Sequence, residues 1–192
     1  MRVCFGGSFN PPTKAHLAII DYLAKRYQEV IIVPNGNSYE RKELIPFKLR
    51  VAMLKLMIHG YNNIVISDYE MKNDVFLGTV MMLRHFNHPL FVIGADNLLT
   101  IKTWINYDDL IKENHFLVFP RNQIDAQSII QNDSFLKQYQ NHFQIITDFE
   151  QIEISSTEYR NNLNEDLLTK EVLKFIKENN LYEVNSCIIK NS

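Results

Sequence analysis

Glycines, hydroxyl groups and one histidine follow the first apolar run of the chain. Residues 2–5 are typical of a short buried strand, and Gly6 and Gly7 are expected to stop it and let the backbone approach a ligand closely. Thr13 stands where a helix N-cap would stand, and a helical pattern that contains His16 begins there. In a parallel sheet such a junction lies at the carboxyl end of a strand, where backbone N–H groups and the helix dipole favour an anion.

A second segment, residues 154–160, repeats this combination far away in the sequence. It places the hydroxyl residues 155–157 at the start of a predicted helix and ends on Arg160. Two such turns, each with one strong donor (His16 and Arg160), meet the requirements for holding a polyphosphate at two points. Neither turn matches G-x-x-x-x-G-K-[ST] or G-x-G-x-x-G, so the chain is predicted to be neither a P-loop NTPase nor a typical dehydrogenase.

His16 also has a purely structural interpretation. Ile20, Leu23 and Tyr27 lie on the same helical face, so His16 extends an apolar stripe into the first turn. A lone histidine in that position is more often a capping or core residue. The glycine pair that precedes it favours a place in the ligand crevice instead.

Strands and helices alternate along the chain and predict how these residues are positioned. Such alternation is typical of one α/β domain, residues 1–192, with a doubly wound and mostly parallel sheet. Residues 68–76 are expected to be irregular. After the first strand, the expected strands are 29–34, 64–67, 90–93, 115–119 and 143–146, and the expected helices are 14–26, 46–59, 78–86, 107–114, 128–139, one starting near 154, and 170–179.

Composition excludes several classes of function. The formal net charge of −2 gives no broad basic field for nucleic acid, and no apolar run is long enough to cross a membrane. Cys4 and Cys187 lie at opposite ends of the chain and are interpreted as free thiols, which favours a cytoplasmic protein. The histidines other than His16 have no metal-ligand spacing.

Both turns resemble the motifs of the nucleotidylyltransferase superfamily, which implies its Rossmann-like fold. GGSFNPPTKAH at 6–16 resembles the first motif, whose core is [H/T]-x-G-H, and ISSTEYR at 154–160 resembles I-S-S-T-x-x-R. GADNL at 94–98, Trp104, and Arg121 of FPRN are similar to bacterial nicotinate-nucleotide adenylyltransferases. The resemblance covers almost the whole chain.

The chain departs from that group at several places. Ala15 replaces a glycine, and Asn10 stands where the group usually has aspartate. Residues 39–43 read YERKE, without the usual Pro-Pro-His-Lys, and residues 77–79 read LGT where Ser-Tyr-Thr is usual. The altered loops are those that hold the acceptor in the family.

The resemblance implies transfer of AMP from ATP to the 5′-phosphate of nicotinate mononucleotide, with release of pyrophosphate. His16 and Arg160 would neutralise the leaving pyrophosphate, with Mg²⁺ bridging the phosphates. The ATP- and phosphate-binding residues implied are Gly6, Gly7, Ser8, Phe9, Thr13, Gly94, Asp96, Ile154, Ser155, Ser156 and Thr157. The acceptor-binding residues implied are Lys42, Thr79, Trp104 and Arg121, with Lys48 and Arg50 as further candidates for phosphate contacts.

Several alternatives remain open at the level of sequence. Asp96 is either a ribose ligand or an N-cap, Trp104 is either a stacking surface for a pyridine ring or a core residue, and Arg121 either pairs with the nicotinate carboxylate or is solvated. The acceptor is alternatively nicotinamide mononucleotide or phosphopantetheine, and a cytidylyltransferase or a non-catalytic nucleotide-binding homologue is also conceivable. The expected partners are ATP and a pyridine mononucleotide, with a homo-oligomer as a possible assembly.

Overall fold

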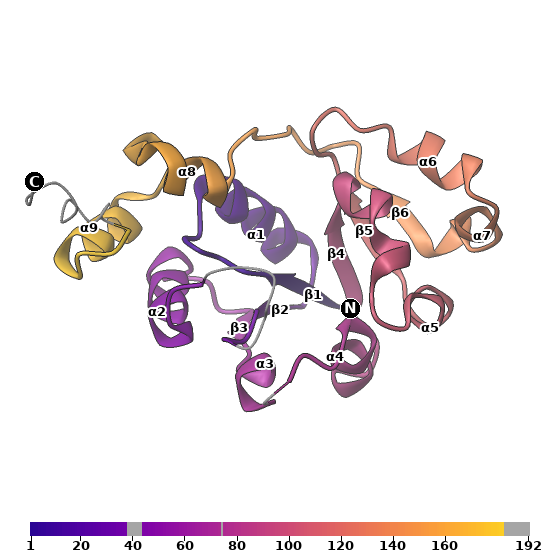
Figure 1. Ribbon diagram of the computed structural model, residues 1–192, viewed down its shortest axis with the longest axis horizontal. Coiled ribbons are helices and arrows are strands. Elements are labelled where there is room, and N and C mark those ends of the chain that lie inside the picture. Colours follow the sequence, from indigo (N-terminus) through magenta and orange to yellow (C-terminus); the bar gives the residue numbers. More distant parts are fainter. Residues whose placement is uncertain (38–43, 74, 183–192) are drawn as a thin grey trace, which may run out of the picture.

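A six-stranded parallel sheet forms the centre of the molecule, with the strand order β3-β2-β1-β4-β5-β6 (Figure 1). The computed structural model describes residues 1–37, 44–73 and 75–182. The strands are β1 (Arg2–Gly7), β2 (Glu29–Pro34), β3 (Ile64–Ile66), β4 (Leu90–Gly94), β5 (Phe116–Phe119) and β6 (Phe143–Ile145). Every neighbouring pair is parallel, so all the carboxyl ends lie at one edge.

Alternation along the strands buries both faces of the sheet. Val30 and Ile32 belong to one hydrophobic cluster, whereas Ile31 and Val33 belong to the other. The first cluster takes apolar side chains from α1 (Lys14–Arg26), α2 (Phe47–Met57), α8 (Ser156–Asn162) and α9 (Lys170–Glu178). The second takes them from α4 (Thr79–His85), α5 (Tyr107–Glu113), α6 (Ala126–Asn132) and α7 (Ser134–Gln138). The predicted doubly wound fold is therefore confirmed.

The strand order reverses between β1 and β4. The chain moves outward from β1 to β2 and β3, then returns to β4 on the other side of β1. Loops that leave β1 and β4 consequently diverge to opposite faces and open a crevice at their carboxyl ends, which is where open α/β sheets bind ligands.

Four details differ from the sequence-based expectations. Gly6 and Gly7 do not stop the first strand, because both stay in the parallel register with Val33 and Pro34. The helix expected over 128–139 is two helices, because the Asp133 side chain accepts N–H bonds from residues 135 and 136 and caps α7. A short helix, α3 (Tyr69–Lys72), forms in the stretch expected to be irregular. After β4, where an N-cap at Asp96 would begin a helix, the chain forms a pair of 3₁₀ turns, η1 (Ala95–Leu99) and η2 (Ile101–Thr103).

Two further 3₁₀ turns complete the described structure, η3 (Gln140–His142) before β6 and η4 (Glu165–Leu167) before α9. Cys4 lies at the centre of β1, where burial raises the pKa of its thiol, so it stays protonated and unreactive. Cys187 lies outside the described residues. No described helix has the length and apolar character that crossing a bilayer requires.

Candidate active site

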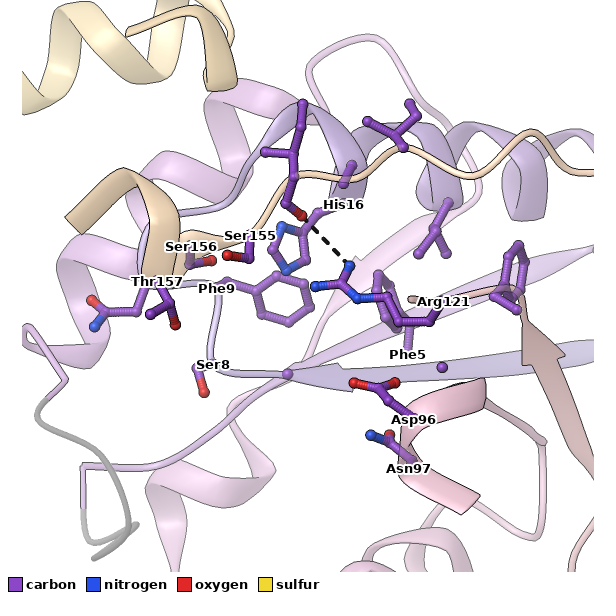
Figure 2. A pocket seen from close by; sticks show the side chains of 18 of the residues that line it. Phe5, Ser8, Phe9, His16, Asp96, Asn97, Arg121, Ser155, Ser156 and Thr157 are labelled. Carbon is purple, nitrogen blue, oxygen red and sulfur yellow. Dashed lines mark hydrogen bonds between the residues drawn. The ribbon is translucent and has the colours of Figure 1, made fainter. Parts of the chain in front are cut away.

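Two cavities meet at the carboxyl end of β1. The first has a volume of about 310 Å³ and is lined by the β1–α1 turn, the start of η1, the end of β5 and the start of α8 (Figure 2). The second has a volume of about 210 Å³ and lies toward β2, α3 and α4. Gly7, Ser8 and Asn97 line both cavities, so the two spaces adjoin across the glycine turn.

The two predicted anion-binding turns come together in the first cavity. His16 from α1 and Arg160 from α8 both line it. The segments are joined directly, because Arg160 Nη1 donates to the Asn10 carbonyl at 2.7 Å and Ser156 Oγ donates to the Pro11 carbonyl at 2.8 Å. The start of α8 therefore holds the β1–α1 turn, and one ligand in this cavity can be contacted from both.

Hydrogen bonding orients the imidazole of His16. The backbone N–H of Thr13 donates to His16 Nδ1 at 3.0 Å, and the Thr13 hydroxyl lies 2.8 Å from the same nitrogen. Since Nδ1 is the acceptor, the ring hydrogen of the neutral imidazole is on Nε2. Phe9 packs against the ring with centroids 5.1 Å apart, which fixes its plane. His16 thus presents an N–H donor suited to a phosphate oxygen.

Thr13 is the predicted N-cap of α1, but it does not make the phosphate contact that the resemblance implies. Its side chain is 0% exposed and lines neither cavity, so a direct contact with phosphate oxygens is incompatible with this structure. The physical reason is its position as N-cap of α1, where the hydroxyl faces His16 instead. Thr13 is a positioning residue.

The other residues expected to bind ATP are found in both cavities, most of them in the first. The first cavity is lined by Gly7, Ser8, Phe9, Gly94, Asp96, Ile154, Ser155, Ser156 and Thr157. Gly6 lines only the second. Asp96 is not the N-cap of η1, since that position belongs to Gly94, and its carboxylate borders the cavity (Figure 2). Ser155 caps α8, where its hydroxyl accepts the N–H of Glu158 at 3.0 Å.

The residues expected to bind the acceptor do not all line the same cavity. Thr79 and Trp104 line the second cavity, where Trp104 is half-buried and meets Phe91 edge-on with ring centroids 6.5 Å apart. Arg121 lines the first cavity, and its Nη1 donates to the Ile154 carbonyl at 3.5 Å (Figure 2). It follows β5, whose end faces the first cavity. Lys42 lies outside the described residues.

Arg50, a candidate for a phosphate contact, is structural. Its guanidinium is 0% exposed and donates to the carbonyls of Ile45, Ser8 and Asn35 at 2.9, 2.9 and 2.7 Å. Burial lowers the pKa of this guanidinium, but arginine stays charged at neutral pH. Arg50 therefore ties together the loops that follow β1 and β2. Lys48 is exposed and lines neither cavity.

Among the residues that the sequence analysis did not single out, Tyr182 supports the first cavity through Asn10 and Glu70 lines the second. Tyr182 donates to Asn10 Oδ1 at 2.8 Å, and burial raises the pKa of the Tyr182 hydroxyl, so it remains a donor. Glu70 lines the second cavity from α3. Its position a few residues after a strand was the available signal, since that places it at the ligand-binding edge.

The all-parallel sheet with a cavity at its switch point is a Rossmann-like fold of the nucleotidylyltransferase type. Comparisons agree with this class. Residues 4–162 match the family described as cytidylyltransferase-like. A "probable nicotinate-nucleotide adenylyltransferase" from Acholeplasma laidlawii is 36% identical over 95% of this chain and 98% of its own length. One from Clostridium acetobutylicum is 32% identical, over 94% and 98% of the two chains.

A solved structure shares the fold. It is the Plasmodium falciparum nicotinic acid mononucleotide adenylyltransferase complexed with NaAD, which superimposes with a TM-score of 0.77 at 21% identity, over 94% of this chain and 97% of that one. The chain belongs to the cytidylyltransferase-like family, in its nicotinate-nucleotide adenylyltransferase branch.

Proposed function

We propose that this protein transfers AMP from ATP to the 5′-phosphate of nicotinate mononucleotide, which yields nicotinate adenine dinucleotide and pyrophosphate. The observation that carries the proposal is the pair of adjoining cavities, one with His16 and Arg160 and the other with Trp104. The relatives named for this activity support it. ATP binds in the first cavity, the pyridine nucleotide in the second, and the reacting phosphates meet at the shared Gly7–Ser8 turn.

The reaction requires the protein to align the two substrates and to stabilise the negative charge on the leaving pyrophosphate. A phosphate monoester has a second pKa near 6, so the acceptor is already a nucleophile at neutral pH and needs no general base. Its oxygen attacks the α-phosphorus of ATP, and the bond to the bridging oxygen breaks with its electron pair leaving on pyrophosphate. His16 Nε2–H and the Arg160 guanidinium stabilise the charge that develops on that leaving group.

The remaining lining residues hold the nucleoside part of ATP. Asp96 accepts hydrogen bonds from ribose hydroxyls, which its carboxylate at the cavity border permits. Arg121 lies in the same cavity and is therefore assigned to ATP rather than to the acceptor. Ser156 and Thr157 supply hydroxyls close to the phosphates.

A divalent metal ion fits this site only when the nucleotide phosphates supply most of its ligands. Asp96 is the sole acidic residue among the described residues that line the first cavity, so the protein offers no carboxylate cage. Mg²⁺ is commonly held by substrate phosphates and water with few protein ligands. We propose that Mg²⁺ arrives with ATP and screens its phosphates. We propose that the enzyme acts in the cytoplasm, where ATP is available.

Nicotinamide mononucleotide is the second candidate acceptor. Among the described residues lining the second cavity there is no lysine or arginine to pair with a nicotinate carboxylate. The sister acceptor, which has a neutral amide in place of that carboxylate, therefore merits a direct comparison.

Pyrophosphate release tests these proposals. The purified chain is given ATP and Mg²⁺ with nicotinate mononucleotide, nicotinamide mononucleotide or phosphopantetheine in turn. We expect turnover with nicotinate mononucleotide above all, and a fall in kcat of at least about 100-fold in His16→Ala and Arg160→Ala, comparable to removing a single transition-state donor. Lys48→Ala, outside both cavities, serves as the control. Full turnover in either active-site variant would refute the assigned roles, and no turnover with any acceptor would refute the activity.

A further inference from the structure

The second cavity contains an acidic residue that the proposed reaction does not use. Glu70 lies on α3, is half-buried, and lines the cavity together with Trp104 and Thr79. It is the only charged residue among the described residues that line this space. The backbone N–H of Gly36, in the loop after β2, favours the charged form of its carboxyl, which opposes the rise in pKa that burial causes. Gly36 also lies directly against the backbone of Glu70.

The acceptor offers a matching charge. In a pyridine mononucleotide the ring nitrogen is bonded to ribose and carries a permanent positive charge. An aromatic face attracts such a cation, and a carboxylate in a partly desolvated site attracts it more strongly than one in water. Trp104 supplies the first kind of group and Glu70 the second.

We propose that Glu70 is a specificity-determining residue that binds the acceptor by its positively charged pyridinium ring. The inference rests on the proposed function, since it takes the pyridine nucleotide to occupy the second cavity. Phosphate recognition at the glycine turn selects a mononucleotide, and Glu70 with Trp104 selects a ring that is both flat and cationic.

Glu70 also behaves unlike a residue kept for stability. Burial raises the pKa of its carboxyl above the usual value, with the Gly36 N–H acting in the opposite direction. A carboxyl whose pKa is higher in the folded than in the unfolded state disfavours folding once the pH exceeds the unfolded value. Glu70→Gln keeps the shape and an oxygen for Gly36, so it should leave the melting temperature unchanged or raise it. A structural role predicts the opposite.

Trp104 is the single tryptophan of the chain and lines the same cavity, so its fluorescence reports binding directly. Wild type, Glu70→Gln and the control Asp68→Asn are titrated with nicotinate mononucleotide and with oxidised and reduced nicotinamide mononucleotide. The last two differ by a hydride that removes the ring charge. Asp68 is an exposed partner of Lys72 on the same turn, outside the cavity.

We expect Glu70→Gln to raise the Kd of both charged nucleotides about tenfold, equivalent to about 1.4 kcal/mol. The Kd of the reduced nucleotide should stay within about twofold of wild type, and Asp68→Asn should bind as wild type does. Unchanged binding of nicotinate mononucleotide by Glu70→Gln would overturn the proposal, as would an equal loss for the oxidised and reduced nucleotides. If wild-type fluorescence responds to none of the three, the proposed function fails first and this inference with it.

Discussion

Replacing Arg50 with methionine tests how the two cavities are held in shape. The substitution keeps most of the aliphatic stem of the side chain and removes the guanidinium. Three carbonyl oxygens, of Ser8, Asn35 and Ile45, then lose their donor inside the protein. Ser8 lines both cavities and Asn35 lines the second, so the damage reaches the binding sites.

The expected loss of stability follows from the burial of Arg50. A hydrogen bond from a charged donor contributes about 1.5–3 kcal/mol, and breaking a buried charged network typically costs about 3–5 kcal/mol. We take about 4 kcal/mol for Arg50→Met, within that range. For a domain of this size each kcal/mol shifts the melting temperature by about 2–4 °C, so the shift should be about 8–16 °C.

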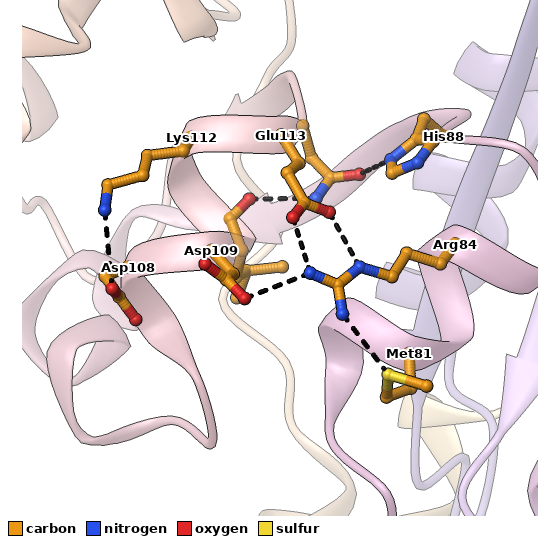
Figure 3. Close-up of polar contacts among 9 residues, drawn as sticks. Met81, Arg84, His88, Asp108, Asp109, Lys112 and Glu113 are labelled. Atoms are coloured by element: carbon orange, nitrogen blue, oxygen red, sulfur yellow. Dashed lines mark hydrogen bonds and ion pairs between the residues drawn. The ribbon is translucent and has the colours of Figure 1, made fainter.

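Arg84 provides a matched control. Like Arg50 it has several partners, since it pairs with Asp109 and Glu113 and contacts Met81, but these partners lie at the surface (Figure 3). Exposed ion pairs are screened by water, so Arg84→Met should lower the melting temperature only slightly despite its two carboxylate partners.

Both variants are compared with wild type by thermal unfolding and by steady-state kinetics. Arg50→Met should also raise the KM of the acceptor, whereas Arg84→Met should leave both KM values unchanged. If Arg50→Met melts no lower than Arg84→Met, burial does not decide the strength of these contacts and the reasoning is wrong.

Three further substitutions have distinct expected outcomes. Thr13→Val removes the hydroxyl beside His16 but keeps the backbone N–H. The loss of one hydrogen bond of about 1 kcal/mol should lower kcat about fivefold and leave the KM of ATP unchanged. A raised KM of ATP would instead indicate that Thr13 contacts the phosphates directly. Gly94→Ala would place a Cβ against the carboxylate of Asp96. The Asp96 side chain can rotate away, so we expect a higher KM for ATP without a loss of thermal stability. Tyr182→Phe removes the bond to Asn10 and should lower the melting temperature by about 2–4 °C, for a loss of about 1 kcal/mol; an unchanged melting temperature would contradict this.

Local patterns predicted the sheet and the first cavity correctly. Apolar runs of strand length and capped helix starts are properties of consecutive residues, so strands such as β2 and the turn at Thr13 could be inferred directly. The meeting of His16 with Arg160 could be expected as well, because both follow from motifs and from the common edge of a parallel sheet.

The position of a side chain at the crevice also depends on which face of the sheet its loop covers. Local sequence patterns do not determine that face. Arg121 follows β5 and falls in the first cavity, whereas Trp104 lies in the second. Arg50 lies on a helix whose pattern is compatible with a solvent-exposed cation, and only the packing of three loops around it explains its burial. Glu70 belongs to a polar stretch, and the sequence pattern there does not indicate which of its side chains faces the second cavity.

The arginines of this structure divide into two groups by the kind of oxygen they contact. Those at the crevice donate to neutral oxygens: Arg50 and Arg121 to backbone carbonyls, and Arg160 to a carbonyl and a threonine hydroxyl. Those elsewhere among the described residues pair with carboxylates: Arg2 with Glu29, Arg26 with Asp148, and Arg84 with Asp109 and Glu113.

This division has an electrostatic consequence. A guanidinium bound by carbonyls keeps its full charge, whereas one bound by carboxylates is neutralised locally. Among the described residues that line the first cavity, the cations Arg121 and Arg160 therefore outnumber the one carboxylate, Asp96, in a chain whose formal net charge is −2. Gathering uncompensated like charges at one place opposes folding, and a bound polyanion removes that cost. Asn10 fits the same logic, because an aspartate there would bring a negative charge to the turn that Arg160 contacts.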